Sequence, residues 1–126
     1  MAESVASASG VRDGSDRVLL VMIASNPAML DDLITALLDI GVTGATVIET
    51  KGMGAILRED MPIFAGLASL IPEHTGSRVV LSLTTSKQAG EAFRYLLDEL
   101  EPNERPIAFT TPVDRICGLK RAGDDS

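Results

Sequence analysis

One stretch of the chain, residues 30–54, constrains the fold more than any other part of the sequence. It begins with apolar residues at the three- and four-residue spacing of a helix that has one buried side, namely Leu30, Leu33, Ile34, Leu37 and Leu38. Gly41 follows as a helix end, because glycine adopts positive φ without a Cβ clash. Residues Gly44–Lys51 are rich in Thr, Val and Ile, which favours a strand. The stretch therefore predicts a helix, a glycine-containing turn and a strand in direct succession.

The residues before this stretch supply a first strand and the start of the helix. Arg17–Ala24 is a nearly continuous aliphatic run, which suits a central strand buried on both faces or at a subunit contact. The Asn26 side chain can accept a hydrogen bond from the first free amides of the helix, and Pro27 at the first helical position loses no hydrogen bond. Residues 1–16 and 121–126 carry too little apolar surface to offset the entropy of ordering, so both are predicted to be disordered tails.

The second half of the chain repeats the pattern of strand, helix and strand. Arg78–Thr85 is the third strand, and Thr85 with Gln88 can form a capping box at the start of a second helix. An apolar stripe runs along that helix through Ala89, Ala92, Phe93, Leu96, Leu97 and Leu100. Pro106–Pro112 is the fourth strand, and its terminal prolines either place it at an edge or make it short. This order predicts one α+β domain over residues 17–120, a ferredoxin-like βαββαβ sandwich whose antiparallel sheet carries two helices on one face.

A long connection, residues 52–77, separates the two halves. Connections beyond about 12 to 15 residues are uncommon in compact domains unless they are functional or disordered. The centre of this one, residues 61–72, is too apolar for a solvated tail. We expect it to be partly ordered and to act as a partner-binding loop through four apolar side chains, Ile63, Phe64, Leu67 and Leu70.

Charge and composition exclude several classes of partner. The net charge of −7 works against nucleic acid and anionic membranes, because backbone binding needs clustered Lys and Arg. The longest apolar run, Val18–Ala24, is far below the roughly 20 residues of a spanning helix. No secretory signal is present, so we expect a cytoplasmic protein. The single cysteine, Cys117, cannot form an internal disulfide and is predicted to be a small buried thiol.

The sequence offers no arrangement of residues that suits catalysis or metal binding. Asp31 and Asp32 are adjacent in a helix and so point in different directions, and their place near the helix start explains them as helix-end charges. His74 is the sole histidine and has no neighbouring ligand, and no serine has a partner base. We expect no enzyme activity, no metal and no catalytic cofactor.

The residues around the first turn resemble a known family. Gly41, Thr43, Gly44, Thr46, Val47, Lys51, Gly52 and Gly54, with Leu30, Asp31 and Asp32 before them, stand where the PII nitrogen-regulatory proteins have their motif. The resemblance implies a homotrimeric signal-transduction protein that senses a small molecule and acts on a target protein through its long loop. It also implies an adenine nucleotide in an intersubunit cleft lined by Thr43, Thr46, Gly52, Met53, Gly54, Arg105, Arg115 and Lys120. Taken alone, Gly52 and Gly54 are better explained by a strand exit that needs positive φ, and the resemblance makes phosphate binding an equal alternative.

The chain departs from the family pattern downstream. Ala55 and Ile56 replace the Arg-Gln pair that helps to hold magnesium in PII proteins, and Glu101–Pro106 replaces a Gly-rich, lysine-flanked phosphate turn. The only tyrosine, Tyr95, falls in the second helix, which excludes tyrosine modification of the loop. The resemblance therefore implies a divergent PII-like protein that prefers AMP or ADP to ATP, if it binds nucleotide, and lacks magnesium-bridged 2-oxoglutarate. The alternative is an interaction module without a ligand, which docks through the apolar loop 61–72.

Overall fold

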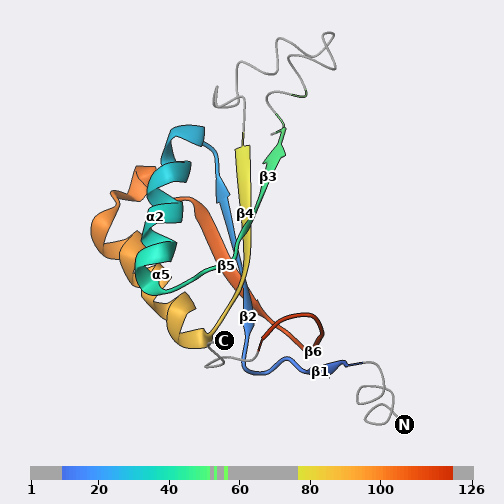
Figure 1. Ribbon diagram of the computed structural model, residues 1–126. Helices are drawn as coiled ribbons and strands as arrows, with labels where there is room; N and C mark the ends of the chain where they lie inside the picture. The colour runs from blue at the N-terminus through green and yellow to red at the C-terminus, as the bar shows by residue number, and fades with distance from the viewer. Residues whose placement is uncertain (1–9, 52, 54–55, 57–76, 121–126) are drawn as a thin grey trace.

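A four-stranded antiparallel sheet covered on one face by two helices forms the centre of the molecule (Figure 1). The computed structural model describes residues 10–51, 53, 56 and 77–120. The sheet has the order β3-β4-β2-β5, with strands β2 (Val18–Ala24), β3 (Thr46–Thr50), β4 (Ser77–Thr84) and β5 (Ile107–Pro112). Helices α2 (Leu30–Ile40) and α5 (Ser86–Glu99) pack side by side on it. The predicted ferredoxin-like arrangement is confirmed, and β5 lies at an edge as its flanking prolines indicate.

The start and end of α2 follow from single residues. The Asn26 side chain accepts a hydrogen bond from the amide of Ala28 at 3.0 Å, as predicted. The residues that follow form a short 3-10 helix, η1 (Pro27–Met29), so the α-helical part begins at Leu30, later than the sequence suggests. At the other end, Gly41 has φ of 101°, and its amide donates to carbonyls of the last turn. A residue with a Cβ would be strained there, so the helix stops and the chain turns toward β3.

The predicted capping box at the start of α5 is present. The amide of Gln88 donates to the Thr85 hydroxyl oxygen at 3.1 Å, and the amide of Thr85 donates to the Gln88 side chain at 3.0 Å. These two reciprocal bonds satisfy amides that have no partner inside the helix. Tyr95 lies in α5 as predicted, and partial burial, followed by the charges of Asp32 and Glu99, raises the pKa of its phenol above the ordinary value.

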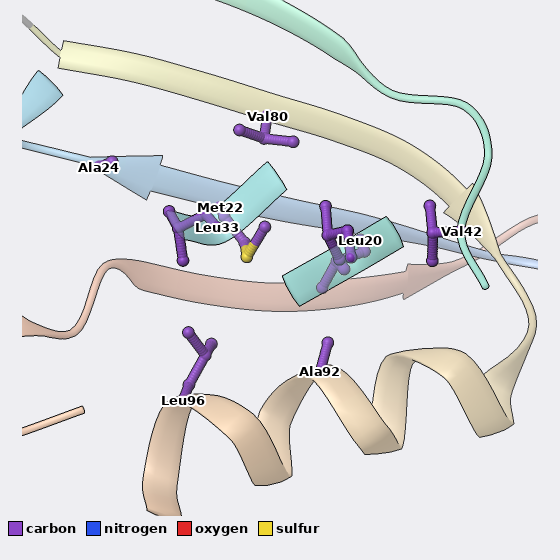
Figure 2. Packing of buried hydrophobic residues seen from close by; sticks show 9 residues of the cluster. Leu20, Met22, Ala24, Leu33, Val42, Val80, Ala92 and Leu96 are labelled. Atoms are coloured by element: carbon purple, nitrogen blue, oxygen red, sulfur yellow. The ribbon is translucent and has the colours of Figure 1, made fainter. Parts of the chain in front are cut away.

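The hydrophobic core fills the space between the sheet and the helices. Alternate residues of β2 point toward the helical layer, where Leu20 and Met22 are almost completely buried. Figure 2 shows them packed with Leu33 of α2, Val80 of β4, and Ala92 and Leu96 of α5. The buried members of the core include no aromatic residue, as the low aromatic content of the chain predicts, and Phe93 and Tyr95 pack against it from partly buried positions.

The opposite face of the sheet is largely apolar, and no helix of the described residues covers it. Strand register aligns Ile107, Ile23, Val79 and Ile48 in one row across the four strands. A second row joins Phe109, Val21, Leu81 and Thr46. We call these two rows the open face. Its members on the edge strands are exposed, with Ile107 at 65% and Phe109 at 46% of full accessibility. These side chains can be buried only by residues other than the described ones.

A small second sheet joins the two ends of the domain. Strand β1 (Arg12–Asp13) pairs antiparallel with β6 (Arg115–Ile116), and both lie near the first residue of β2 (Figure 1). The disordered tail predicted over residues 1–16 is therefore wrong for its last residues. The sequence did not reveal this pairing because two-residue strands have no detectable periodicity, and their stability comes from a partner about 100 residues away.

The central connection falls almost entirely outside the described residues. This applies to the whole partner-binding loop with Ile63, Phe64, Leu67 and Leu70, and its predicted ordering stays a prediction. Of the residues after β3, Met53 is highly exposed.

The packing predicts a large difference between two leucines of α2. Leu33 is 2% exposed and Leu38 is 61% exposed. Leu33→Ala should lower the free energy of unfolding by about 2 to 5 kcal/mol, because it removes buried methyl groups and leaves a cavity. Leu38→Ala, the matched control, should change it by less than about 0.5 kcal/mol. Urea unfolding followed by circular dichroism measures both, and equal effects would contradict the observed orientation of α2.

Candidate functional site

A cavity of about 550 Å³ lies where the turn after α2 meets the end of β4 and the last described residues of the chain. The backbone of residues 41–46 forms one wall, and Leu19, Leu81 and Leu83 supply apolar side chains. The size and mixed lining are those of sites that hold small organic molecules. We call this cavity the turn pocket.

The wall of the turn pocket is held in place by side chains from β4 and α5. The hydroxyl of Ser82 donates to the carbonyl of Gly44, and the Gln88 side chain donates to the carbonyl of Gly41 at 3.2 Å. Gln88 therefore acts twice, in the capping box of α5 and in anchoring the turn. Thr43 and Thr46, two of the predicted ligand-binding residues, both line the pocket.

Arg17 is the only charged side chain among the described residues that line the turn pocket. Its Nη2 donates to the carbonyl of Lys120 at 2.9 Å, and its Nη1 makes a long bond of 3.5 Å to the carbonyl of Leu83. Its Nε is buried and has no hydrogen-bond acceptor among the described residues, although a carboxylate oxygen of Asp16 lies 3.8 Å away. Sequence reasoning missed this residue, because it treated Arg17 only as the first residue of a strand.

A second arginine holds the same C-terminal residues. Arg12 forms an ion pair with Asp16 at 2.8 Å, and its Nη2 donates to the carbonyl of Leu119 at 3.2 Å. Leu119 itself lines the turn pocket. The last described residues are thus fixed beside the pocket by two side chains from the N-terminal segment.

Arg105, for which ligand binding stays a prediction, caps the end of α5. Its Nε donates to the carbonyls of Leu96 at 3.0 Å and Leu100 at 3.2 Å, and its Nη2 donates to the carbonyl of Leu97 at 3.0 Å. These are carbonyls at the end of α5 that lack helical partners, and a cation there also interacts favourably with the helix dipole. Arg105 does not line the turn pocket.

The remaining predicted ligand residues are distributed differently. The exposed Arg115 forms an ion pair with Asp114 at 3.5 Å and lies outside the pocket lining. Lys120 contributes its backbone carbonyl to the Arg17 bond. Gly52 and Gly54 lie outside the described residues. The structure therefore brings Thr43 and Thr46 together with Arg17, and leaves Arg105 and Arg115 elsewhere.

Four further features of the described residues bear on function. Cys117 is exposed, which corrects the prediction of a buried thiol. Over residues 10–51 and 77–120, no group of three or more acidic, histidine or cysteine side chains is placed to hold a metal ion. None of the helices in the described part has the length and apolar character to cross a membrane. A smaller cavity of about 300 Å³ lies on the other side of the turn, between Leu38 and Val47.

Comparison with known proteins identifies the fold. No protein-family model matches the chain, and no curated protein matches its sequence. Among solved structures, the chain is similar to a protein from Thermus thermophilus described as a PII-like signalling protein. The TM-score is 0.58 at 16% sequence identity, over 80% of this chain and 88% of the other. At this identity the likeness shows a shared fold.

The bonds of Arg105 predict its effect on stability. Arg105→Ala should lower the free energy of unfolding by about 1.5 to 3 kcal/mol, because three carbonyls at the end of α5 lose a charged donor. Arg115→Ala is the matched control, since that ion pair is exposed and worth less than about 1 kcal/mol. Chemical unfolding measures both variants. A loss at Arg105 no larger than that at Arg115 would show that the cap does not stabilise the helix.

Proposed function

We propose that the protein is a homotrimeric regulatory protein that senses a small molecule in the turn pocket and signals to a partner protein through its long central loop. The observation that carries the proposal is the position of the pocket. It lies at the turn Gly41–Thr46, the same residues whose pattern resembles the PII motif. The shared fold with a PII-like signalling protein supports a signalling role. No catalytic step is part of this proposal.

The open face supports the trimeric state. A monomer would leave two rows of aliphatic and aromatic side chains in contact with water, and such patches mark association sites in soluble proteins. A closed ring of three copies would cover these rows, as the resemblance to PII proteins implies. The helical layer would then point outward, and the turn pocket, whose lining includes Leu81 and Thr46 of the open face, would lie beside the covered rows.

Introducing a charge on the open face tests the assembly. Phe109→Glu should convert the trimer to a monomer at micromolar concentration, because it places a carboxylate in the interface without a partner. Leu97→Glu is the matched control: this leucine is 61% exposed on α5, and the trimer should persist. Light scattering coupled to size-exclusion chromatography gives the mass. A monomeric mass for the unmodified chain would refute the trimer.

Calorimetry with a defined panel tests the sensor. We expect AMP or ADP to bind more tightly than ATP, because Glu101 and Glu104 stand where PII proteins have a basic phosphate turn. ATP and 2-oxoglutarate should show no magnesium-dependent co-binding, since Ile56 offers no oxygen ligand. Thr43→Glu, at an exposed position in the pocket wall, should weaken binding at least about tenfold without changing the fold. Tight magnesium-dependent co-binding would instead indicate an ordinary nitrogen sensor.

A ligand-free interaction module is the competing function. A ligand that binds only the folded state raises stability by RT ln(1 + [L]/Kd), which is about 2.7 kcal/mol at a concentration of one hundred times Kd. A thermal-shift screen of adenine nucleotides, cyclic nucleotides, bicarbonate and 2-oxoglutarate that gives no shift for the wild-type trimer would favour the module. The loop 61–72 would then be the docking element.

A further inference from the structure

On one edge of the Arg17 guanidinium, only one of the two nitrogen donors has a hydrogen-bond acceptor among the described residues. Nε and Nη2 lie on the same edge of the guanidinium plane and together form a fork that matches the two oxygens of a carboxylate or phosphate. Nη2 is bonded to the Lys120 carbonyl, whereas Nε is buried without a hydrogen-bond acceptor among the described residues. A buried donor in this state is costly, and the side chain lines a cavity large enough for a metabolite.

The surroundings of Arg17 favour a negative ligand. Segments 12–17 and 114–120 carry four basic and three acidic side chains, in a chain whose net charge is −7. The nearest acidic group, Asp16, has one oxygen bound by Arg12 at 2.8 Å, and its other oxygen stays beyond hydrogen-bond distance from Nε. Among the described residues, the ion pair of Arg17 is thus the 3.8 Å contact with a carboxylate that Arg12 also binds.

The C-terminal residues beside the pocket depend on the same arginine. Over residues 117–120, no backbone-to-backbone hydrogen bond to another described residue is present. The segment is held by the bonds from Arg12 to Leu119 and from Arg17 to Lys120, and it includes Gly118, whose φ is 81°. We call residues 117–120 the C-terminal strap. Loss of the Arg17 bond would leave it attached to the pocket rim only by Arg12.

We propose that the turn pocket binds the oxyanion of a small metabolite through the Nε and Nη2 of Arg17, and that this oxyanion displaces the Lys120 carbonyl and releases the C-terminal strap. The ligand class is a compact phosphate or carboxylate compound. This inference rests on the proposed use of the turn pocket as an effector site, and adds the charge of the effector and the element that responds to it. The signal is the change in strap mobility.

Nuclear magnetic resonance of the full chain, labelled with nitrogen-15, tests the proposal in low-salt buffer. Inorganic phosphate and succinate are titrated separately, and the tighter of the two identifies the oxyanion. The Nε–Hε resonance of Arg17 and the amide of Gly44 should shift saturably. The heteronuclear Overhauser effect at Leu119 and Lys120 should fall as the strap becomes mobile. Absence of a saturable shift at Arg17 with either probe would overturn the proposal.

Three variants and a neutral ligand test whether Arg17 binds the anion and whether the ligand of the turn pocket is anionic. Arg17→Gln should weaken the binding of both anions at least about tenfold, and Arg17→Lys, which keeps the charge but lacks the fork, should weaken it by a similar factor. Arg115→Gln is the matched control and should bind as wild type does. Unchanged binding in both Arg17 variants would refute the role of Arg17. Shifts of Gly44 and Thr46 with adenosine but with neither anion would preserve the effector site and refute its anionic ligand.

Discussion

The structure depends on a sheet whose two faces are both largely apolar, while the helices of the described residues cover only one of them. The central strand β2 sets this constraint, because its residues alternate between the helical core and the open face, and all of them are apolar. Leu20 and Met22 are buried against side chains of α2 and α5. Val21 and Ile23 face away from the helices, and only neighbouring strands cover them. Cover for the open face must therefore come from outside the described residues.

The turn pocket shows how the core and the candidate site share residues. Gly41 ends α2, Gln88 caps α5 and also binds the carbonyl of Gly41, and Ser82 reaches from the sheet to Gly44. The pocket wall is thus attached to both helices and to β4. A ligand that moves this turn would act directly on elements of the core, which is a physical route from a binding event to the rest of the domain.

The arginines differ in whether their donors are already bound to groups of the fold or could still bind a ligand. Arg105 uses its donors on helix carbonyls, and Arg78 forms an ion pair with Glu49 on the neighbouring strand at 3.0 Å. Arg17 differs because its Nε has no hydrogen-bond acceptor among the described residues and its side chain lines a cavity. Sequence alone does not separate these cases, since each arginine simply stands at the end of a strand or helix.

The sequence by itself determined the order of helices and strands, the capping residues Asn26, Gly41 and Thr85, and the turn that carries Thr43 and Thr46. These features are local: a helix period, a cap or a strand depends on residues a few positions apart, so the pattern contains the information. Only the tertiary structure decided the pairing of β1 with β6, the capping role of Arg105 and the position of Arg17 in the turn pocket. Each of these depends on which distant backbone groups need a hydrogen-bond partner after the chain has folded. That need has no periodicity in the sequence, because it arises from the packing of segments such as residues 12–17 and 115–120 against each other.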